Sequence, residues 1–247
     1  MEMRAILAGA SRRVLDTVLP LRCLACGTIV EMGALCLECW QGLELIGAPL
    51  CARCGLPFDH DEGPDALCGG CLAREPAFDR ARSALRYNDL SAKLIIGFKH
   101  GDRTHHLGAF ALWLARAAGP LLEEAELIAC VPLHPSRLLA RRFNQSALLA
   151  QALAAHAGRR AQVDLLARWR ATPSQAGLSR LQRFENLRGA IAVRPRRAAQ
   201  VAGRRVLVID DVFTTGATLE ACARALKRAG AAAVDVATLA RVVRGAT

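Results

Sequence analysis

Residues 206–219 read VLVIDDVFTTGATL, and this stretch decides the fold of the chain. It opens with four apolar residues, three of them β-branched, which is typical of a strand buried on both faces of a parallel sheet. Asp210 and Asp211 follow at the carboxyl end of that strand. An alanine-rich helix is expected from about Ala217 to Ala229, where Gly230 ends it. The stretch therefore predicts a strand, a short loop and a helix in succession.

The loop between this strand and this helix has the composition of an anion site. Ligands of open parallel sheets bind at the carboxyl ends of strands, and the free N–H groups of a helix N-terminus favour a phosphate. Gly216 lets the backbone approach a ligand closely. The loop also carries three hydroxyl donors, those of Thr214, Thr215 and Thr218. We expect residues 214–218, Ala217 included, to bind a phosphate, and the preceding acids to bind sugar hydroxyls or a hydrated Mg²⁺.

This pattern resembles the phosphoribosyl-pyrophosphate (PRPP) signature of type I phosphoribosyltransferases, in which T-T-G-x-T follows an apolar strand and two acids. The resemblance implies that Asp210 and Asp211 hold the ribose of PRPP and that residues 214–218 hold its 5′-phosphate. The sequence contains neither G-x-x-x-x-G-K-[ST] nor G-x-G-x-x-G, the signatures of two other nucleotide-binding folds. An acidic turn between an ordinary strand and helix is the structural alternative.

The size and charge of the chain limit its class. A length of 247 residues accommodates one large and one small domain, and a hydrophobic content of 53% supports a full core. The net charge of +11 is uneven, because residues 1–75 carry −4 and residues 76–247 carry +15. The basic surface therefore belongs to the second segment, where it favours phosphates or nucleic acid as partners.

The N-terminal residues 1–20 predict an amphipathic helix. Their apolar positions are interrupted by Arg12, Arg13 and Asp16, unlike the continuous apolar segment of a secretory signal. Such a helix can contact a membrane surface, although packing on the core of the same chain is the more usual role. No apolar run in the sequence approaches the ~18 residues of a transmembrane segment. We therefore expect a cytoplasmic protein.

Residues 21–75 carry eight of the ten cysteines, in four C-x-x-C pairs: Cys23/Cys26, Cys36/Cys39, Cys51/Cys54 and Cys68/Cys71. Two pairs supply the thiolates of one closed tetrahedral Zn²⁺ site, so four pairs predict two structural zinc ions. Trp40 and Phe58 are the aromatic residues of this segment, too few for a core of its own. Metal must then supply folding free energy, on the order of 10 kcal/mol per site.

The pairing of these cysteines has two solutions. Sequential pairing gives a double zinc ribbon, and cross-braced pairing is the alternative. Disulfides would require a secreted chain, and a redox C-x-x-C is not expected in four near-regular copies. Cys130 and Cys222 lie among apolar neighbours and are expected to be small core residues.

Residues 76–247 alternate between strand and helix patterns. Further strands are expected at 81–87, 127–131, 162–166, 190–193 and 233–239. Helices are expected at 90–98, 106–118, 145–157 and 179–186, with Ser179 as a cap and with Gly119-Pro120 ending the second helix. Strands separated by helices predict an α/β fold with a parallel sheet.

Two basic segments are further candidates for the site. Residues 132–135 read PLHP, a stiff loop after a strand, so His134 and Arg137 suit the pyrophosphate of PRPP with its Mg²⁺. The alternative is a helix start with solvated arginines. Residues 170–188 are expected to form a lid that excludes water, through Thr172, Gln175, Arg183 and Asn186.

The segment beyond this lid is the candidate nucleic-acid contact. Residues 180–205 hold eight arginines and one acid, Glu185, which is too charged for a simple connection. We expect phosphate contacts to single-stranded DNA, without sequence preference, from Arg194, Arg196 and Arg197.

Four blocks together resemble the ComF family of competence-associated proteins. They are the C-x-x-C pairs, VPLHP with RRFNQ, TPSQAGLSRLQRFENLRGA and VLVIDDVFTTGAT, and they span about residues 21–241. The resemblance implies a zinc module before a phosphoribosyltransferase-like domain. It also implies a role in natural transformation or a related use of DNA, with single-stranded DNA and other DNA-uptake proteins as partners. Arg142 stands where we expect the family's motif to have glycine.

Two functions are consistent with this resemblance. In one, the protein binds PRPP and contacts DNA, with weak or absent catalysis. In the other, Asp210 and Asp211 are catalytic residues of a transferase that moves phosphoribosyl from PRPP to an acceptor and releases pyrophosphate.

Overall fold

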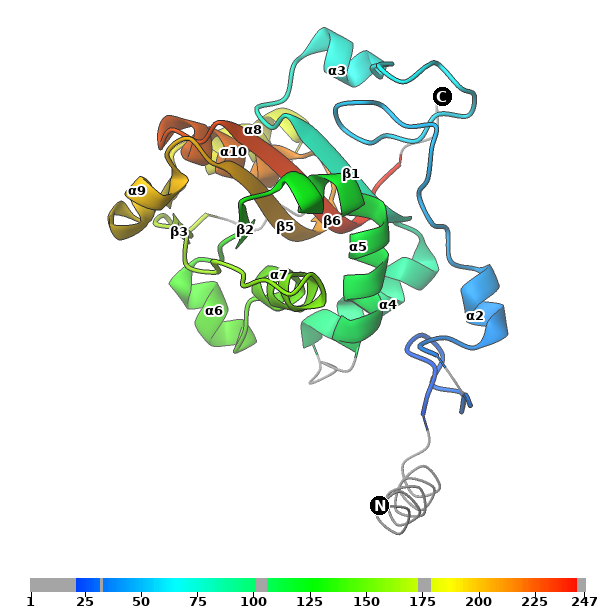
Figure 1. The fold of residues 1–247 in the computed structure, drawn as a ribbon. Coiled ribbons are helices and arrows are strands. Elements are labelled where there is room, and N and C mark those ends of the chain that lie inside the picture. Colours follow the sequence, from blue (N-terminus) through cyan, green and yellow to red (C-terminus); the bar gives the residue numbers. More distant parts are fainter. Residues whose placement is uncertain (1–20, 32, 101–105, 173–178, 244–247) are drawn as a thin grey trace, which may run out of the picture.

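The computed structural model describes residues 21–31, 33–100, 106–172 and 179–243. A four-stranded parallel sheet with the strand order β1-β6-β5-β2 forms its centre (Figure 1). The strands are β1 (Arg80–Arg86), β2 (Leu127–Cys130), β5 (Arg205–Phe213) and β6 (Ala233–Arg241). Strand β5, which contains the first eight residues of the decisive stretch, lies between β6 and β2. The α/β fold with a parallel sheet is therefore confirmed.

Helices cover both faces of this sheet (Figure 1). One face carries α4 (Asp89–His100), α5 (Leu107–Glu124) and α7 (Gln145–His156). The other face carries α10 (Ala217–Arg228), and α8 (Arg180–Leu187) packs on α10. Short helices complete the chain: α2 (Leu37–Gln41), α3 (Gly69–Ala73), α6 (Pro135–Arg141), η2 (Pro195–Arg197) and α9 (Ala198–Val201).

Strand β5 contributes to both hydrophobic cores. Leu207 and Ile209 pack with the core of α5 and α7, whereas Val206 and Val208 pack with the core of α10. All four side chains are 0% exposed. Alternate residues of a strand point to opposite faces, so the continuous apolar run is what allows helices on both sides.

The strand expected at 162–166 is wrong. The chain touches the edge of β2 through the Gln162 amide, which donates to the Ile128 carbonyl, and then turns. The strand that forms is β3 (Leu166–Arg168), which pairs antiparallel with β4 (Ile191–Val193) in a separate two-stranded sheet. The parallel sheet therefore ends at β2.

The helix end expected at Gly119-Pro120 is also wrong, because α5 continues to Glu124 with Pro120 inside it. A proline inside a helix removes one backbone hydrogen bond. Leu121 and Leu122 continue the buried face of the helix, at 2% and 8% exposure, and their burial offsets that loss. The other expected strands and helices of the described residues form within a few residues of their predicted bounds. The amphipathic helix expected at 1–20 lies outside the described residues.

The eight paired cysteines form two clusters, one of Cys23, Cys26, Cys36 and Cys39, the other of Cys51, Cys54, Cys68 and Cys71. The Sγ atoms within each cluster lie within 4.8 Å of one another, which confirms sequential pairing and rules out the cross-braced alternative. The described cysteines are all free thiols. A tetrahedral site with Zn–S bonds of about 2.3 Å has S–S edges of about 3.8 Å. The Sγ separations of 3.7 Å between Cys26 and Cys36 and 3.6 Å between Cys54 and Cys68 fit such a site.

The second cluster also provides the donors that a metal-bound thiolate needs. The Cys51 Sγ accepts hydrogen bonds from the Cys54 and Cys68 amides, at 3.5 and 3.3 Å. The hydrogen bond from the Cys54 thiol, with these amides, lowers the pKa of Cys51 to about 4 despite its burial. The thiolate is the form that binds zinc. By contrast, burial raises the pKa of Cys130 to about 12, consistent with the core role expected for it and Cys222.

The second ribbon shares a hydrophobic core with the sheet. Its four cysteines pack in the same cluster as Val206, Val208 and α10. Gly55, at φ +68°, passes so close to β1 that a Cβ there would lie 2.4 Å from the Ala81 carbonyl oxygen. The first ribbon, which includes α2, lies at the other side, where Leu24 and Leu43 pack with the core of α5 (Figure 1). The domain boundary expected at residue 76 stays a prediction. Residues on both sides of it belong to the same hydrophobic core.

Among the described residues, no helix is long and apolar enough to cross a membrane.

We expect purified protein to hold two Zn²⁺ per chain, because each cluster has four thiolates at zinc spacing. Elemental analysis under reducing conditions, without chelator, measures this ratio. Cys26→Ser should lower it to one, because three thiolates leave the first site open. Cys130→Ser, outside both clusters, is the matched control and should keep two. A ratio of one or zero in the parent would contradict the double ribbon.

Arg142 is the only non-glycine residue with positive φ in the described ranges, at +66°. A residue with a side chain is strained by about 1–2 kcal/mol in this conformation. Glycine avoids this strain but loses more backbone entropy on folding, which is the smaller of the two costs. Arg142→Gly should therefore raise the free energy of unfolding by about 0.5–1 kcal/mol in chemical denaturation. Arg141→Gly, in the last turn of α6, should lower it by about 1 kcal/mol. If both changes destabilise the protein, the contacts of the Arg142 side chain contribute more to stability than its backbone strain costs.

Candidate functional site

The two acids of β5 are held in fixed orientations at the edge of the sheet. The Ser146 hydroxyl of α7 donates to Asp210 Oδ1 at 2.8 Å, and the Asp211 amide donates to the same oxygen at 2.9 Å. The Val212 amide donates to Asp211 Oδ1 at 2.7 Å. Both carboxylates are half-buried. Hydrogen bonds from fixed donors hold the two carboxylates in set orientations, as acceptors for hydroxyl groups must be.

The loop after β5 has the geometry of an anion cradle. Gly216 adopts φ +80°, and a Cβ there would lie 2.8 Å from the Phe213 ring, so only glycine fits. It precedes α10, whose N-terminus has no side-chain cap. The Thr215 hydroxyl is buried without a hydrogen-bond partner, while Thr214 is exposed. Uncapped N–H groups and an unpartnered hydroxyl beside a close backbone turn suit a phosphate.

The His134 loop lies at the same edge, because β2 pairs with β5 up to Cys130 and Ile209. His134 caps α6, and its Nδ1 accepts from the Ser136 amide at 3.3 Å. His134 thus stands at a helix start, and its contact with pyrophosphate stays a prediction. The Arg137 Nη2 donates to the Thr172 carbonyl at 2.8 Å. The structure therefore brings Arg137 and the first predicted lid residue together.

Helix α8, which belongs to the predicted lid, reaches the predicted phosphate loop through Arg183. It begins with a capping box between Ser179 and Gln182, so the predicted cap is confirmed. Arg183 Nη1 lies 3.5 Å from Thr214 Oγ1. The Asn186 carbonyl accepts from Arg170 Nη2 at 3.1 Å. Gln175 lies outside the described residues.

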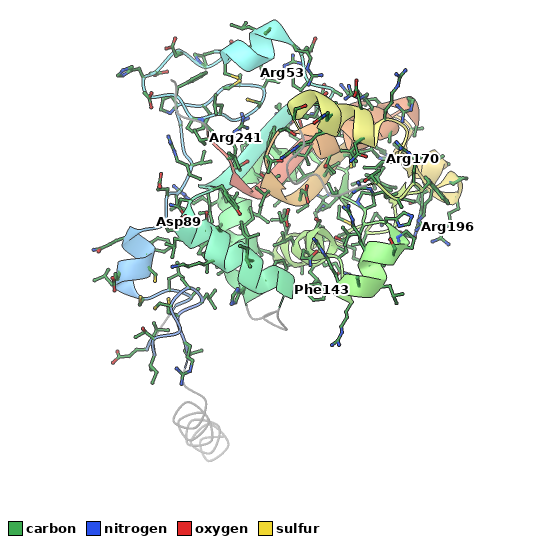
Figure 2. All side chains as sticks on the ribbon, turned by 180° about the vertical axis from the view of Figure 1, so that it is seen from behind. Arg53, Asp89, Phe143, Arg170, Arg196 and Arg241 are labelled. Carbon is green, nitrogen blue, oxygen red and sulfur yellow. The ribbon has the colours of Figure 1, made fainter. Side chains whose placement is uncertain are left out.

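The predicted DNA contacts have partners outside the acid pair and the 214–218 loop. Asp164 pairs with Arg196 at 2.9 Å and with Arg197 at 3.0 Å. The hydrogen bond from Arg197 lowers the pKa of Asp164 below its usual value. The Arg194 guanidinium lies 5.8 Å from the centroid of the Trp169 ring. In Figure 2, Arg196 lies at the right margin of the molecule and Arg241 lies left of its centre.

Sequence reasoning missed three features of the site. The first is Ser146, which orients Asp210. Its sequence signal is the start of α7, where Asn144 caps the helix by accepting a hydrogen bond from the Ser146 amide at 3.1 Å. Glu220, 2% exposed in the first turn of α10, pairs with Arg74 from the second ribbon. A cavity of about 270 Å³ lies between that ribbon and residues 214–216. The last two depend on contacts between distant segments and leave no local pattern.

Two family models match the chain. The double zinc ribbon domain matches residues 14–72, and the phosphoribosyl transferase domain matches residues 144–246. The match to the first agrees with the two cysteine clusters, and the match to the second covers the acid pair, the phosphate loop and α8.

Three similar proteins extend over most of the chain. The DNA utilization protein YhgH of Salmonella typhimurium is 36% identical over 201 residues, covering 78% of this chain and 85% of that protein. Competence protein F of Haemophilus influenzae is 29% identical over 235 residues, covering 89% and 96%. Competence protein ComFC of Bacillus subtilis is 27% identical over 222 residues, covering 84% of each. Because it has a double zinc ribbon and a phosphoribosyltransferase domain and is similar to these proteins over most of its length, the chain belongs to the ComF family.

Proposed function

We propose that this protein binds PRPP with Mg²⁺ at the carboxyl edge of β5 and β2, and that it serves DNA uptake or DNA use in the cytoplasm. One observation carries the PRPP assignment. The oriented acid pair, the uncapped N-terminus of α10 and the turn at Gly216 follow one another within nine residues of β5 and α10. Each suits a different group of a phosphorylated sugar.

The division of roles follows from the chemistry of these groups. Asp210 and Asp211 accept hydrogen bonds from the ribose hydroxyls, and the backbone of residues 214–218 donates to the 5′-phosphate. Arg137, and His134 at the start of α6, face the pyrophosphate. Mg²⁺ binds phosphate oxygens and neutralises their charge. Arg183, from α8, closes the site from the lid side.

Whether the bound PRPP reacts is a separate proposal. In the transfer reaction, a nucleophilic acceptor forms a bond to C1 of the ribose. The C1–O bond to pyrophosphate breaks, and the pyrophosphate leaves with the electron pair. The carboxylates of Asp210 and Asp211 then stabilise positive charge that develops on the ribose. Pyrophosphate release during a screen of nucleobases with PRPP distinguishes an enzyme from a binding protein.

Contact with single-stranded DNA is the second candidate function. It is favoured by the charge of +15 on residues 76–247 and by the relative described as a DNA utilization protein. Arg194, Arg196 and Arg197 form the proposed surface. Asp164 neutralises one charge of this surface and holds two of its arginines in place.

We expect Asp210→Asn and Asp211→Asn each to weaken PRPP–Mg²⁺ binding about tenfold or more. A charge-assisted hydrogen bond is worth roughly 1.5–3 kcal/mol, and each change removes the charge. Thr215→Ala should cost less, because the backbone donors remain. Asp89→Asn, an exposed acid at the start of α4, is the matched control for calorimetry. Unchanged affinity in both variants of the acid pair would make that pair structural.

We expect the triple change Arg194→Ala, Arg196→Ala and Arg197→Ala to weaken oligonucleotide binding and to leave PRPP affinity unchanged. The dependence of log affinity on log salt should also become shallower, by about 0.7 for each phosphate that the protein no longer neutralises. Asp164→Asn should act in the opposite direction, because it removes a negative charge from the same surface. Fluorescence anisotropy over a salt series measures both effects. Equal binding by parent and triple variant at every salt concentration would place the DNA surface elsewhere.

A further inference from the structure

One arginine connects the second zinc ribbon to the end of β5, the strand that leads into the phosphate loop. Arg241, the last residue of β6, is 8% exposed. Its Nη1 donates to the Cys54 carbonyl oxygen, and its Nη2 donates to Cys54 Sγ at 3.4 Å. Cys54 is a member of the second cysteine cluster. Arg241 therefore interacts directly with a thiolate of that zinc site and with the backbone that holds it.

The same arginine also contacts the residue on which the phosphate loop closes. Its guanidinium lies 4.3 Å from the centroid of the Phe213 ring. Phe213 is the residue that comes within 2.8 Å of a Cβ at Gly216, so its ring position fixes the turn of the loop. Phe78, which follows the ribbon, packs edge-on against Phe213 at 5.9 Å. Contacts therefore run without a break from Cys54 through Arg241 and Phe213 to Gly216.

A second brace connects the ribbon to the helix that follows the loop. Arg74, three residues after Cys71, pairs with both carboxylate oxygens of Glu220 in the first turn of α10. Arg224 pairs with Glu220 at 3.0 Å. The Arg74 guanidinium also lies 4.5 Å from the centroid of the Phe184 ring in the lid helix. The ribbon thus contacts the loop, the start of α10 and the lid.

The first zinc cluster has a different setting. Its knuckle lines a cavity with His106, next to α5, and Leu24 belongs to the core on the opposite face of the sheet. By contrast, the second ribbon lines one side of the cavity beside the phosphate loop, with Cys54, Cys68 and Cys71 among its lining residues. The two zinc sites are therefore chemically alike but differ in what they contact, which supplies an internal control.

We propose that the second zinc site, acting through Arg241, positions the phosphate loop. Loss of the ribbon removes both acceptors of a buried guanidinium, and a buried charge without partners is strongly unfavourable. Arg241 must then leave the Phe213 ring, which releases the constraint on Gly216. Arg241 is thus a positioning residue, and zinc in the second site maintains the form of the loop that accepts phosphate. The link to PRPP rests on the proposed function.

Hydrogen exchange of the 213–219 segment, measured without PRPP, tests the coupling itself. Cys71→Ser, in the second site, should accelerate exchange of these amides about tenfold or more. Cys26→Ser, in the first site, should leave their exchange unchanged. PRPP affinity should fall about tenfold in the first of these variants and stay within twofold in the second. Unchanged exchange of the loop in Cys71→Ser would overturn the proposal.

Arg241→Met separates the link from unfolding of the ribbon. The methionine side chain fills much of the space and keeps neither the charge nor the hydrogen bonds. We expect two Zn²⁺ per chain to remain, with faster loop exchange and about tenfold weaker PRPP binding. Arg241→Lys should restore part of the affinity, because the charge returns without the paired hydrogen bonds. A variant that keeps its zinc, its loop protection and its PRPP affinity would also overturn the proposal.

The PRPP and exchange measurements fail independently. If the parent does not bind PRPP, the proposed function is wrong, and the exchange data still decide whether the second zinc site controls the loop. If the parent binds PRPP and the variants Cys71→Ser and Arg241→Met bind it equally well, the proposed function stands and Arg241 has no positioning role.

Discussion

Burial of β5 on both faces is the constraint on which the rest of the structure depends. Its four apolar residues give each core two side chains, and this requires helices on both sides and a neighbouring strand on each edge. The polar continuation of the same strand then emerges at the edge of the sheet. Asp210 and Asp211 are half-buried there, directly after Ile209, the last of the four fully buried residues. The position of the site is thus a consequence of core packing.

Much of the site could be predicted from residues 206–230, because its determinants are local. The apolar run, the glycine at the turn and the alanine-rich helix are neighbours in sequence, and each has a short-range physical meaning. Arg142 is a similar case. It occupies a position where the family is expected to have glycine, and its backbone adopts the left-handed conformation that glycine favours. The cysteine pairs are equally local, because a C-x-x-C knuckle has one principal geometry around a metal.

The remaining features depend on interactions that no local pattern encodes. Pro120 is a residue that usually ends a helix, but burial of Leu121 and Leu122 decides the length of α5. Strand β3 forms only because β4 comes back to pair with it. The sequence shows Arg196 and Arg197 as uncompensated charges, but Asp164, more than 30 residues earlier, neutralises part of them. Arg241 and Cys54 are 187 residues apart, so their hydrogen bonds appear only in three dimensions.

The place of β6 in the sheet affects how the chain is made. This strand follows the other three strands of the parallel sheet in sequence but lies between β1 and β5, so the sheet cannot form until β6 has left the ribosome. Chains are synthesised from the N-terminus, and early segments normally fold first. Here the second ribbon is synthesised before the sheet, but Arg241, whose side chain braces it, follows Cys54 by 187 residues. During translation its four thiols must acquire metal or wait without that support, and a nascent chain that stalls before β6 exposes them together with the apolar face of β1.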